Sequence, residues 1–410
     1  MAASVLARCR ELARLSEDEG GLCRCYLTPE HKRANALVGR WMREAGMRVR
    51  QDAVGNICGR YEGAEPGMSA VLLGSHLDTV RDAGIFDGAL GVLAAVEITA
   101  RLHRDKLRLP LALETIGFGD EEGVRFGVTL TCSRAVAGTW DDAWLACRDE
   151  SGVPLRDALA EFGLNPAEAR GAGRSPAEIA AYLELHIEQG VLLEKARVPL
   201  GVVSAVNGAR RVECCFYGQS GHAGIVPMGG RKDALAGAAE WISAVERAAE
   251  ADASGCLATV GFIQCGPNVV NVIPGLARMR LDLRGPDEAA LDCLYEEILR
   301  AGASVAGRRA LSFTHEQFYR VRNTPTDARL RSVLGKSIRR VQKKNFVLSS
   351  NAGHDALALA ALCPVGMIFV RCRGGVSHHP DESVETADVA AALSALMLAL
   401  ADIGHGALQS

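Results

Sequence analysis

Short apolar runs that each end in a histidine or an acidic residue constrain the fold of this chain most strongly. Between Arg40 and Thr139, the runs AVLLGS from Ala70 and LALETIGF from Leu111 alternate with segments of helical periodicity. Such runs are typical of buried strands in a parallel sheet that is covered by helices. The sequence therefore predicts an α/β domain whose strands form a mixed sheet.

A different pattern interrupts this domain. From Ala209 to about Arg320 the chain reads as strand, long helix, two strands, helix and strand. This β-α-β-β-α-β order is the split, ferredoxin-like unit. After Pro325 the chain resumes helix, strand and helix, which completes the first domain. We therefore expect one domain at residues 1–206 and 326–410, with a second domain inserted at 207–325.

Charge and hydropathy exclude several classes of partner. Lysine and arginine total 46 against 49 acidic residues, so the net charge of −3 provides no basic field for nucleic acid or an acidic membrane. The longest apolar stretch, Val389 to Ala401, is shorter than a span of about 30 Å of hydrocarbon requires. The first twenty residues are typical of an amphipathic helix and lack the apolar core of a signal peptide. We expect a protein that neither binds nor spans a membrane.

The cysteines favour a reducing compartment. There are thirteen, an odd number, without a C-x-x-C pair or regular spacing. Reduced thiols in the cytoplasm explain this pattern better than a disulfide framework. Two close pairs could bind a metal, although isolated cysteines mostly behave as small hydrophobic residues. These pairs are Cys23 with Cys25, and Cys214 with Cys215.

The first candidate site residues follow the strand at Ala70. In the segment GSHLDTV, His76 and Asp78 lie where an open α/β sheet binds its ligands, beyond the carboxyl end of a strand. Two residues apart on extended chain they share a face, so Asp78 could hold the second ring nitrogen of His76. A solvated histidine beside a capping aspartate is the alternative interpretation.

Further carboxylates follow. Asp87 lies in FDGALG, at a turn that opens an apolar helix, where it could also be a simple N-cap. Asp120, Glu121 and Glu122 come directly after another predicted strand, and three adjacent carboxylates repel one another unless a cation, protons or water neutralise them. Because neighbours on extended chain point in opposite directions, one glutamate can bind a metal while the other faces a bound water.

Two more predicted strands end in histidines. LELHIEQG carries His186, and GGVSHHPDE carries His378 and His379. One histidine alone is more often structural than a ligand. Four strand ends together, however, deliver a set of imidazoles and carboxylates that suits zinc or another borderline divalent ion. This set comprises His76, Asp87, Glu121, Glu122, His186 and His378.

Eight motifs occur here in the order seen in one family: GSHLDTV, FDGALGVLA, DEEGVRFG, LHIEQG, GHAGIVPM, NVVNVIPG, AGHDA and SHHPDE. The chain resembles the hydantoinase/carbamoylase-type amidases, dinuclear zinc-dependent hydrolases that include N-carbamoyl-L-amino-acid hydrolases, β-ureidopropionases and allantoate amidohydrolases. The resemblance covers about residues 70 to 383. It implies a catalytic domain with two divalent cations, zinc first and manganese, cobalt or nickel as alternatives. It also implies an inserted lid that forms the contact of a homodimer.

The resemblance also assigns the metal ligands. It places His76, Asp87 and His186 around one cation, and it makes Asp87 the bridge to a second cation held by Glu122 and His378. This agrees with the local argument, because two cations about 3.5 to 4 Å apart share a two-oxygen carboxylate and a water.

Catalytic roles follow from the same resemblance. Glu121 is expected to be the general base, and Asp78, as the possible partner of the His76 ring, is placed with it among the catalytic residues. His379 is the alternative to His378, which fits the family's His-x-Pro-Asp-Glu spacing. His222 of the lid is expected to act from the partner subunit on the developing oxyanion.

Four residues resemble the family's substrate binders: Gln189, Asn271, Arg284 and His354. An arginine fork matches a carboxylate with two hydrogen bonds, and an amide adds one donor. The chain departs from the family where Ile225 and Val226 replace common threonines, which leaves the substrate side chain open.

The expected reaction is hydrolysis of a terminal ureido amide on a small carboxylate-bearing substrate, with release of ammonia and carbon dioxide. Allantoate and N-carbamoyl-L-amino acids both fit. A dipeptidase or deacylase on the same scaffold is one alternative, but many such enzymes carry a carboxylate where this chain has His186. A metal-binding interaction protein without catalysis is the other, but it should lack Glu121 or a ligand.

Overall fold

The computed structural model describes residues 1–407, which form two compact units. The first unit contains Met1–Ser204, Thr326–Leu348 and the chain from Gly353 onward. The second unit contains Ala205–Pro325 and the short segment Ser349–Ala352, which the sequence assigned to the first domain.

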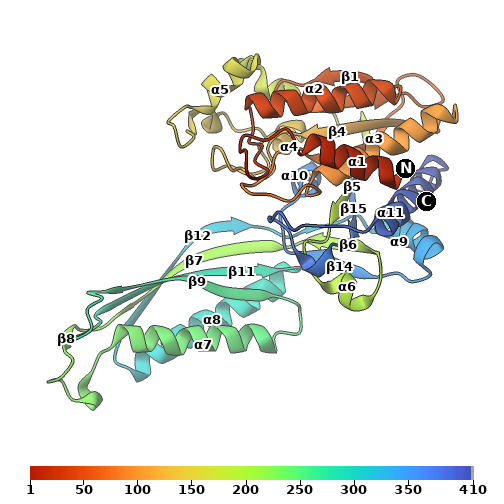
Figure 1. Cartoon of the computed structure of the whole chain (residues 1–410). Helices are drawn as coiled ribbons and strands as arrows, with labels where there is room; N and C mark the ends of the chain where they lie inside the picture. Colours follow the sequence, from red (N-terminus) through yellow and green to blue (C-terminus); the bar gives the residue numbers. More distant parts are fainter. Residues whose placement is uncertain (408–410) are drawn as a thin grey trace. The chain divides into compact units, whose positions relative to one another are not determined.

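A mixed sheet organises the first unit, as expected (Figure 1). Four central neighbours, in the order β4-β3-β5-β15, run parallel, whereas β1, β2 and β6 add to this core in antiparallel fashion. The sheet order is β1-β2-β4-β3-β5-β15-β6, and β14 pairs with β6. The strands are β1 (Arg48–Gln51), β2 (Ile57–Tyr61), β3 (Ala70–His76), β4 (Ala112–Phe118), β5 (Ile179–Ile187), β6 (Leu200–Val206), β14 (Val347–Ser350) and β15 (Val365–Val370).

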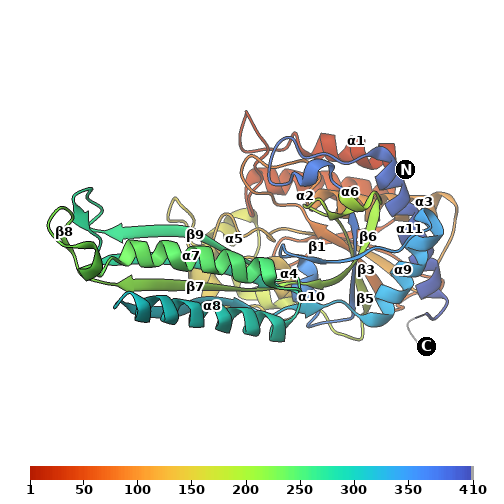
Figure 2. The same ribbon diagram turned by 90° about the horizontal axis from the view of Figure 1, so that it is seen from below.

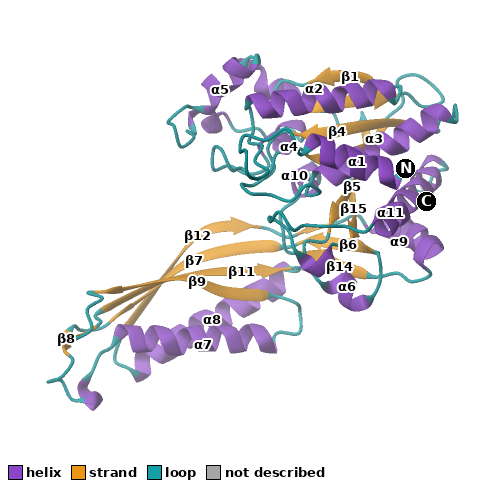
Figure 3. Ribbon diagram, in the orientation of Figure 1, coloured by secondary structure: helices purple, strands orange, loops and turns teal. Residues whose placement is uncertain are grey.

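Helices cover both faces of this sheet (Figure 3). On one face α3 packs along β3, β4 and β5 and contacts α1, α2 and α11, while α9 packs on β15. On the other face α10 packs on β5 and β15 and contacts α4. The helices are α1 (Ala2–Leu12), α2 (Pro29–Glu44), α3 (Ala89–Arg104), α4 (Thr131–Val136), α5 (Leu155–Phe162), α6 (Leu192–Ala196), α9 (Ala328–Gln342), α10 (Asp355–Leu359) and α11 (Thr386–Gly404).

The alternation of β5 shows how the sheet separates its core from its polar face. Leu183, Leu185 and Ile187 belong to the hydrophobic core under α3, and the intervening Glu184 and His186 are buried on the opposite face. The strand therefore places acid and imidazole side chains on the face that α10 covers.

Helix α11 corrects the expectation for the apolar C-terminal stretch. It spans Thr386–Gly404, has a mean hydropathy of 1.7, and is long and apolar enough to cross a membrane by length and composition. Half of the most apolar 18-residue segment of α11 is buried inside the protein. The buried side chains of the helix, including Val389, Leu393 and Leu396, belong to the core of the first unit. The same pattern is typical of the core helix of a globular domain.

The second unit is a four-stranded antiparallel sheet in the order β12-β7-β11-β9. Helices α7 and α8 contact each other and pack on this sheet (Figure 2). Along the chain its elements follow the order β7 (Gly208–Tyr217), α7 (Ala234–Ala251), β9 (Leu257–Gly266), β11 (Leu276–Gly285), α8 (Glu288–Arg308) and β12 (Ser312–Val321). A small pair, β8 (Gly221–His222) with β10 (Val272–Ile273), was not predicted. The fully buried Trp241 lies in the core of this unit.

Candidate metal centre

The predicted ligands gather at the carboxyl ends of the four parallel strands. His76 is the last residue of β3, Glu121 and Glu122 lie just after β4, His186 is near the end of β5, and His378 follows β15. Parallel neighbours deliver their carboxyl ends to one edge, which is where open α/β sheets bind ligands.

Asp87 lies between three imidazoles. Its Oδ1 is 3.0 Å from Nε2 of His186 and 3.5 Å from Nε2 of His76, and its Oδ2 is 3.2 Å from Nε2 of His378. Helix α3 is capped instead by Gly88, without any side-chain hydrogen bond. Asp87 therefore does not act as the helix N-cap, and that alternative is wrong.

A glycine is required next to Asp87. Gly88 has a φ of 64°, and a Cβ at this position would lie 2.6 Å from the ring of His76. Any other residue would combine a strained backbone with a steric clash. The glycine of FDGALG thus lets the chain pass close to one imidazole while it turns the Asp87 carboxylate toward the centre.

Two groups of potential ligands share Asp87. One contains His76 and His186, the other contains Glu122 and His378, and in each group the donor atoms lie within 4.8 Å of one another. His76, Glu121 and Glu122 form a further such group. The structure therefore brings together all six residues that the sequence selected from the strand ends.

His378 and His379 point to different partners. Nε2 of His378 lies 3.1 Å from Glu122 and 3.2 Å from Asp87, with a positive φ of 54° that turns its ring toward the cluster. His379 lies 3.6 Å from Asp381 in its own loop and accepts the backbone N–H of that residue. Of the two imidazoles, only that of His378 belongs to a candidate ligand group of the described residues.

Asp78 faces the His76 ring, as expected, and also has a second role. The Nδ1 atom of His76 lies 2.9 Å from the main-chain carbonyl oxygen of Asp78 and 3.4 Å from its carboxylate. That carboxylate also accepts the backbone N–H groups of Glu121 and Glu122 at 3.0 to 3.1 Å. Asp78 thus fixes the turn that presents the two glutamates, and its backbone orients the imidazole.

The pKa values of Asp87 and Glu121 are shifted in opposite directions. Burial alone would raise the pKa of Asp87, but its close contacts with the imidazoles of His186, His378 and His76 hold it well below its ordinary value. Burial raises the pKa of Glu121 well above its ordinary value; the charge of His76 opposes this, and nearby carboxylates led by Glu122 reinforce it. Asp87 is the stably ionised carboxylate of the centre.

The donor set fits a divalent metal ion. Asp87 Oδ1 and His186 Nε2 are buried and face each other at 3.0 Å, yet neither has a hydrogen-bond partner among the described residues. Two donor atoms in that position are typical of ligands to a common cation. Imidazole and carboxylate donors suit zinc and other borderline divalent ions.

Three supporting residues were missed by the sequence analysis. The buried Glu382 accepts the backbone N–H groups of Phe86 at 2.8 Å and Asp87 at 3.1 Å. Ser377 Oγ lies 3.1 Å from both Asp87 and Glu382. The buried Glu184 accepts the Ser75 hydroxyl at 2.8 Å. All three lie inside or beside motifs chosen for their histidines, and spacing alone did not separate a supporting carboxylate from a solvated one.

Gln189 and His354 also reach the centre. The Gln189 amide donates to Asp87 Oδ2 at 2.9 Å, from a backbone with a φ of 57°. The buried ring of His354 packs edge-on against His186 with 4.5 Å between ring centroids. Burial and then the charge of His186 hold the pKa of His354 well below its ordinary value, which favours a neutral imidazole.

The remaining candidates belong to the second unit. The exposed His222 lies on β8 opposite Val272 of β10. The exposed Asn271 directly precedes Val272, so it is close to His222. Arg284, on β11, donates to Asp282 at 2.8 Å and to the carbonyl oxygen of Asn351 at 2.6 Å.

Comparisons with known proteins identify the family of the chain. Residues 72–402 match the model of peptidase family M20/M25/M40. The chain is 39% identical to a probable allantoate deiminase from Oryza sativa subsp. japonica, over 95% of this chain and 86% of that protein. It is 38% identical to an N-carbamoyl-L-amino acid amidohydrolase from Geobacillus stearothermophilus, over 92% of each. A solved amidase of the hydantoinase/carbamoylase family from Burkholderia multivorans matches with a TM-score of 0.91 and 32% identity, over 98% of this chain and 97% of that one.

Proposed function

The chain belongs to peptidase family M20/M25/M40, among its hydantoinase/carbamoylase-type amidases, and from this we propose that it hydrolyses the terminal ureido amide of a small carboxylate-bearing substrate. The enzyme is a metal-dependent hydrolase of carbon–nitrogen bonds in linear amides. Allantoate and N-carbamoyl-L-amino acids are the proposed substrates, with ammonia and carbon dioxide as by-products.

The position of Asp87 is the observation that carries this proposal. A single carboxylate belongs to two overlapping ligand groups, one with His76 and His186 and the other with Glu122 and His378. We assign these five residues as ligands of two divalent cations, zinc first, with Asp87 shared. Bound there, the cations would lower the pKa of a water molecule and polarise the scissile carbonyl group.

The side chains around the cations would then handle protons and orientation. Glu121, held by the contact of its backbone with Asp78, accepts the proton of the attacking water and returns it to the leaving nitrogen. Gln189 holds the Asp87 carboxylate at 2.9 Å, and the buried His354 supports the ring of His186. Removal of a group that transfers protons in the transition state typically slows an enzyme by about 10²- to 10⁴-fold.

The second unit is proposed to act as a lid and as the contact of a homodimer. Its β-α-β-β-α-β order supports the expected ferredoxin-like insertion. His222 would stabilise the oxyanion of a partner subunit, and Asn271 and Arg284 would bind the substrate carboxylate. The arginine already forms charge-assisted hydrogen bonds, so its fork is oriented before any substrate arrives.

Ammonia release from a substrate panel tests the function directly. The panel contains allantoate, several N-carbamoyl-L-amino acids, β-ureidopropionate and a dipeptide, each with the purified enzyme before chelation, after chelation and after reloading with zinc. We expect ureido substrates alone to react, and only with metal present. The variant Glu121→Gln should keep the metal content of the wild type and lose about 10²- to 10⁴-fold in kcat. Cleavage of the dipeptide in preference to every ureido compound would refute the proposed substrate class.

A further inference from the structure

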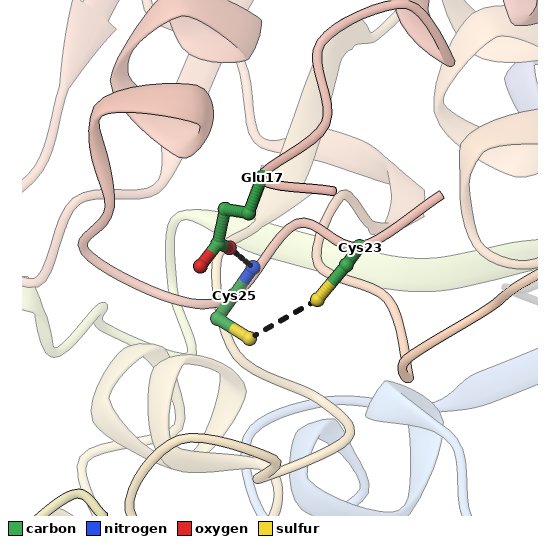
Figure 4. Close-up of side chains that lie close together, drawn as sticks. All are labelled: Glu17, Cys23 and Cys25. Atoms are coloured by element: carbon green, nitrogen blue, oxygen red, sulfur yellow. Dashed lines mark hydrogen bonds between the residues drawn. The ribbon is translucent and has the colours of Figure 1, made fainter. Parts of the chain in front are cut away.

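The loop between α1 and α2 brings two thiols and a carboxylate together. Figure 4 shows Glu17, Cys23 and Cys25, whose potential donor atoms lie within 4.8 Å of one another. Both cysteines are buried, whereas Glu17 is exposed. None of these residues belongs to the metal centre at the sheet edge, and among the five candidate ligand groups of the described chain this is the only one that contains a thiol.

The distance between the two sulfur atoms fits tetrahedral coordination. Sγ of Cys23 and Sγ of Cys25 are 3.8 Å apart. Two thiolates, each about 2.3 Å from one tetrahedral zinc ion, lie about 3.8 Å from each other. The loop therefore already holds the thiols at the separation that such an ion requires. A weak hydrogen bond between the two thiols is the alternative explanation of the same distance.

The carboxylate is fixed beside the thiols by the backbone. The N–H of Cys25 donates to Oε1 of Glu17, which leaves the second carboxylate oxygen for another contact. The N–H of Glu17 donates to the carbonyl oxygen of Cys23 at 2.7 Å, and Ser16 Oγ accepts the N–H of Cys23 at 3.0 Å. These bonds close the loop on itself, so the three donors are arranged before any ligand binds.

Charge at this place also favours a cation. Because the donor atoms of Glu17, Cys23 and Cys25 lie within 4.8 Å of one another, the ionised forms of these side chains would repel one another. A divalent ion bound between two thiolates and a carboxylate replaces that repulsion with attraction. Glu17 is exposed, so one member of the group is open to solvent.

We propose that Glu17, Cys23 and Cys25 form a second, separate metal site, which takes a thiophilic divalent cation of the zinc or cadmium class. Two sulfur ligands and one oxygen ligand leave a fourth position for water. The inference does not rest on the proposed function, because no residue of the sheet-edge centre takes part.

The site would fix the loop between α1 and α2 against the residues that follow β3. Arg24, between the two cysteines, donates from its buried guanidinium to the carbonyl oxygen of Leu77 at 2.6 Å. Its backbone N–H donates to Thr79 Oγ1 at 2.9 Å, and the N–H of Thr79 returns a bond of 3.0 Å to the Arg24 carbonyl oxygen. A cation at the thiols would therefore fix the loop against residues that flank Asp78.

Cadmium titration of the reduced, chelator-treated full chain tests the site. The readout is the ultraviolet charge-transfer band from thiolate to cadmium, to which the imidazoles and carboxylates of the other centre do not contribute. We expect a saturable band in the wild type whose final intensity corresponds to one cadmium ion bound by two thiolates per chain, although the sheet-edge centre takes up part of the added cadmium. Cys23→Ser and Cys25→Ser should each remove the band or raise the Kd at least about 100-fold, whereas Glu17→Gln should raise it at least about tenfold. The matched control is Cys293→Ser, which removes an exposed cysteine outside the group and should leave the titration unchanged.

Two results would overturn the proposal. One is a band of wild-type intensity and Kd in both Cys23→Ser and Cys25→Ser, which would place the cadmium on other thiols. The other is the absence of any saturable band in the wild type, which would leave a thiol–thiol hydrogen bond as the explanation of the 3.8 Å contact. Should a serine variant fail to fold, Glu17→Gln decides the matter, because its side chain is exposed and an unchanged Kd would exclude the carboxylate.

Discussion

Replacement of Glu382 by alanine removes the only side chain in the described structure that binds the backbone N–H groups of both Phe86 and Asp87. The two hydrogen bonds measure 2.8 and 3.1 Å and end on a carboxylate that is only 4% exposed. Hydrogen bonds to charged groups contribute about 1.5 to 3 kcal/mol each, so two contribute about 3 to 6 kcal/mol. Burial and then the charge of Asp87 raise the pKa of Glu382, which means that desolvation and repulsion offset part of this gain. We expect a net loss of about 3 kcal/mol in the local stability of this turn.

Hydrogen exchange of peptides that cover residues 86 and 87 measures this loss directly. Since about 1.4 kcal/mol corresponds to a factor of ten, Glu382→Ala should reduce their protection about 100-fold in the metal-free protein. Metal affinity, measured by competition with a coloured chelator, should fall about 10- to 100-fold. Glu382→Gln is the matched control, because its amide oxygen can accept both N–H groups while its NH₂ faces Ser377. Wild-type protection in the alanine variant, or equal damage by glutamine, would refute the reasoning.

Three further predictions concern single positions. His378→Ala should lose about one cation per chain by elemental analysis while His379→Ala keeps the wild-type content, because only His378 contacts both Asp87 and Glu122; equal loss in both variants would contradict this. Arg284→Lys should raise KM about 10- to 100-fold with a smaller effect on kcat, since lysine lacks the fork that binds a carboxylate; an unchanged KM for the best ureido substrate would remove this role. Burial lowers the pKa of His31 to about 4, so the unfolded chain takes up a proton that the folded protein excludes, and stability falls as the pH drops from about 6.5 to about 4. Urea unfolding across this range should cost the wild type about 3 kcal/mol more than His31→Gln, and parallel pH profiles would show that this histidine is not responsible.

The sequence could select the residues that gather at the sheet edge because strand ends are a local signal. A strand such as β5 and the residues after it can be located from apolar runs, and parallel neighbours must then deliver those residues to one edge. This argument needs no knowledge of side-chain orientation, so it found His76, His186 and His378.

The supporting residues could not be found in this way. Whether Glu382 binds a backbone amide or faces solvent depends on a contact with residues 295 positions away. The carboxylate of Asp78 was likewise predicted to face the His76 ring, which it does at 3.4 Å, but its hydrogen bonds with the N–H groups of the turn after β4 were not predicted. Tertiary contacts of this kind cannot be predicted from the spacing of residues within a motif.

The bounds of the last helix were also incompletely predicted from the sequence. The expected stretch from Val389 to Ala401 stopped where the apolar residues stop, but α11 extends from Thr386 to Gly404. Helix bounds depend on backbone hydrogen bonds and caps, which polar end residues satisfy as well as apolar ones.

The contact between Asp87 and Ser377 joins positions 290 residues apart, with the whole second unit in the intervening chain. During synthesis the ribosome would release Asp87 and both histidines of the first ligand group long before the loop after β15. A nascent chain would therefore expose an incomplete cation pocket, and closing so long a loop is slow compared with forming local structure. On the proposed ligand assignment, the group of Asp87, Glu122 and His378 can therefore form only after the loop that follows β15 has been synthesised, whereas His76, Asp87 and His186 are available much earlier.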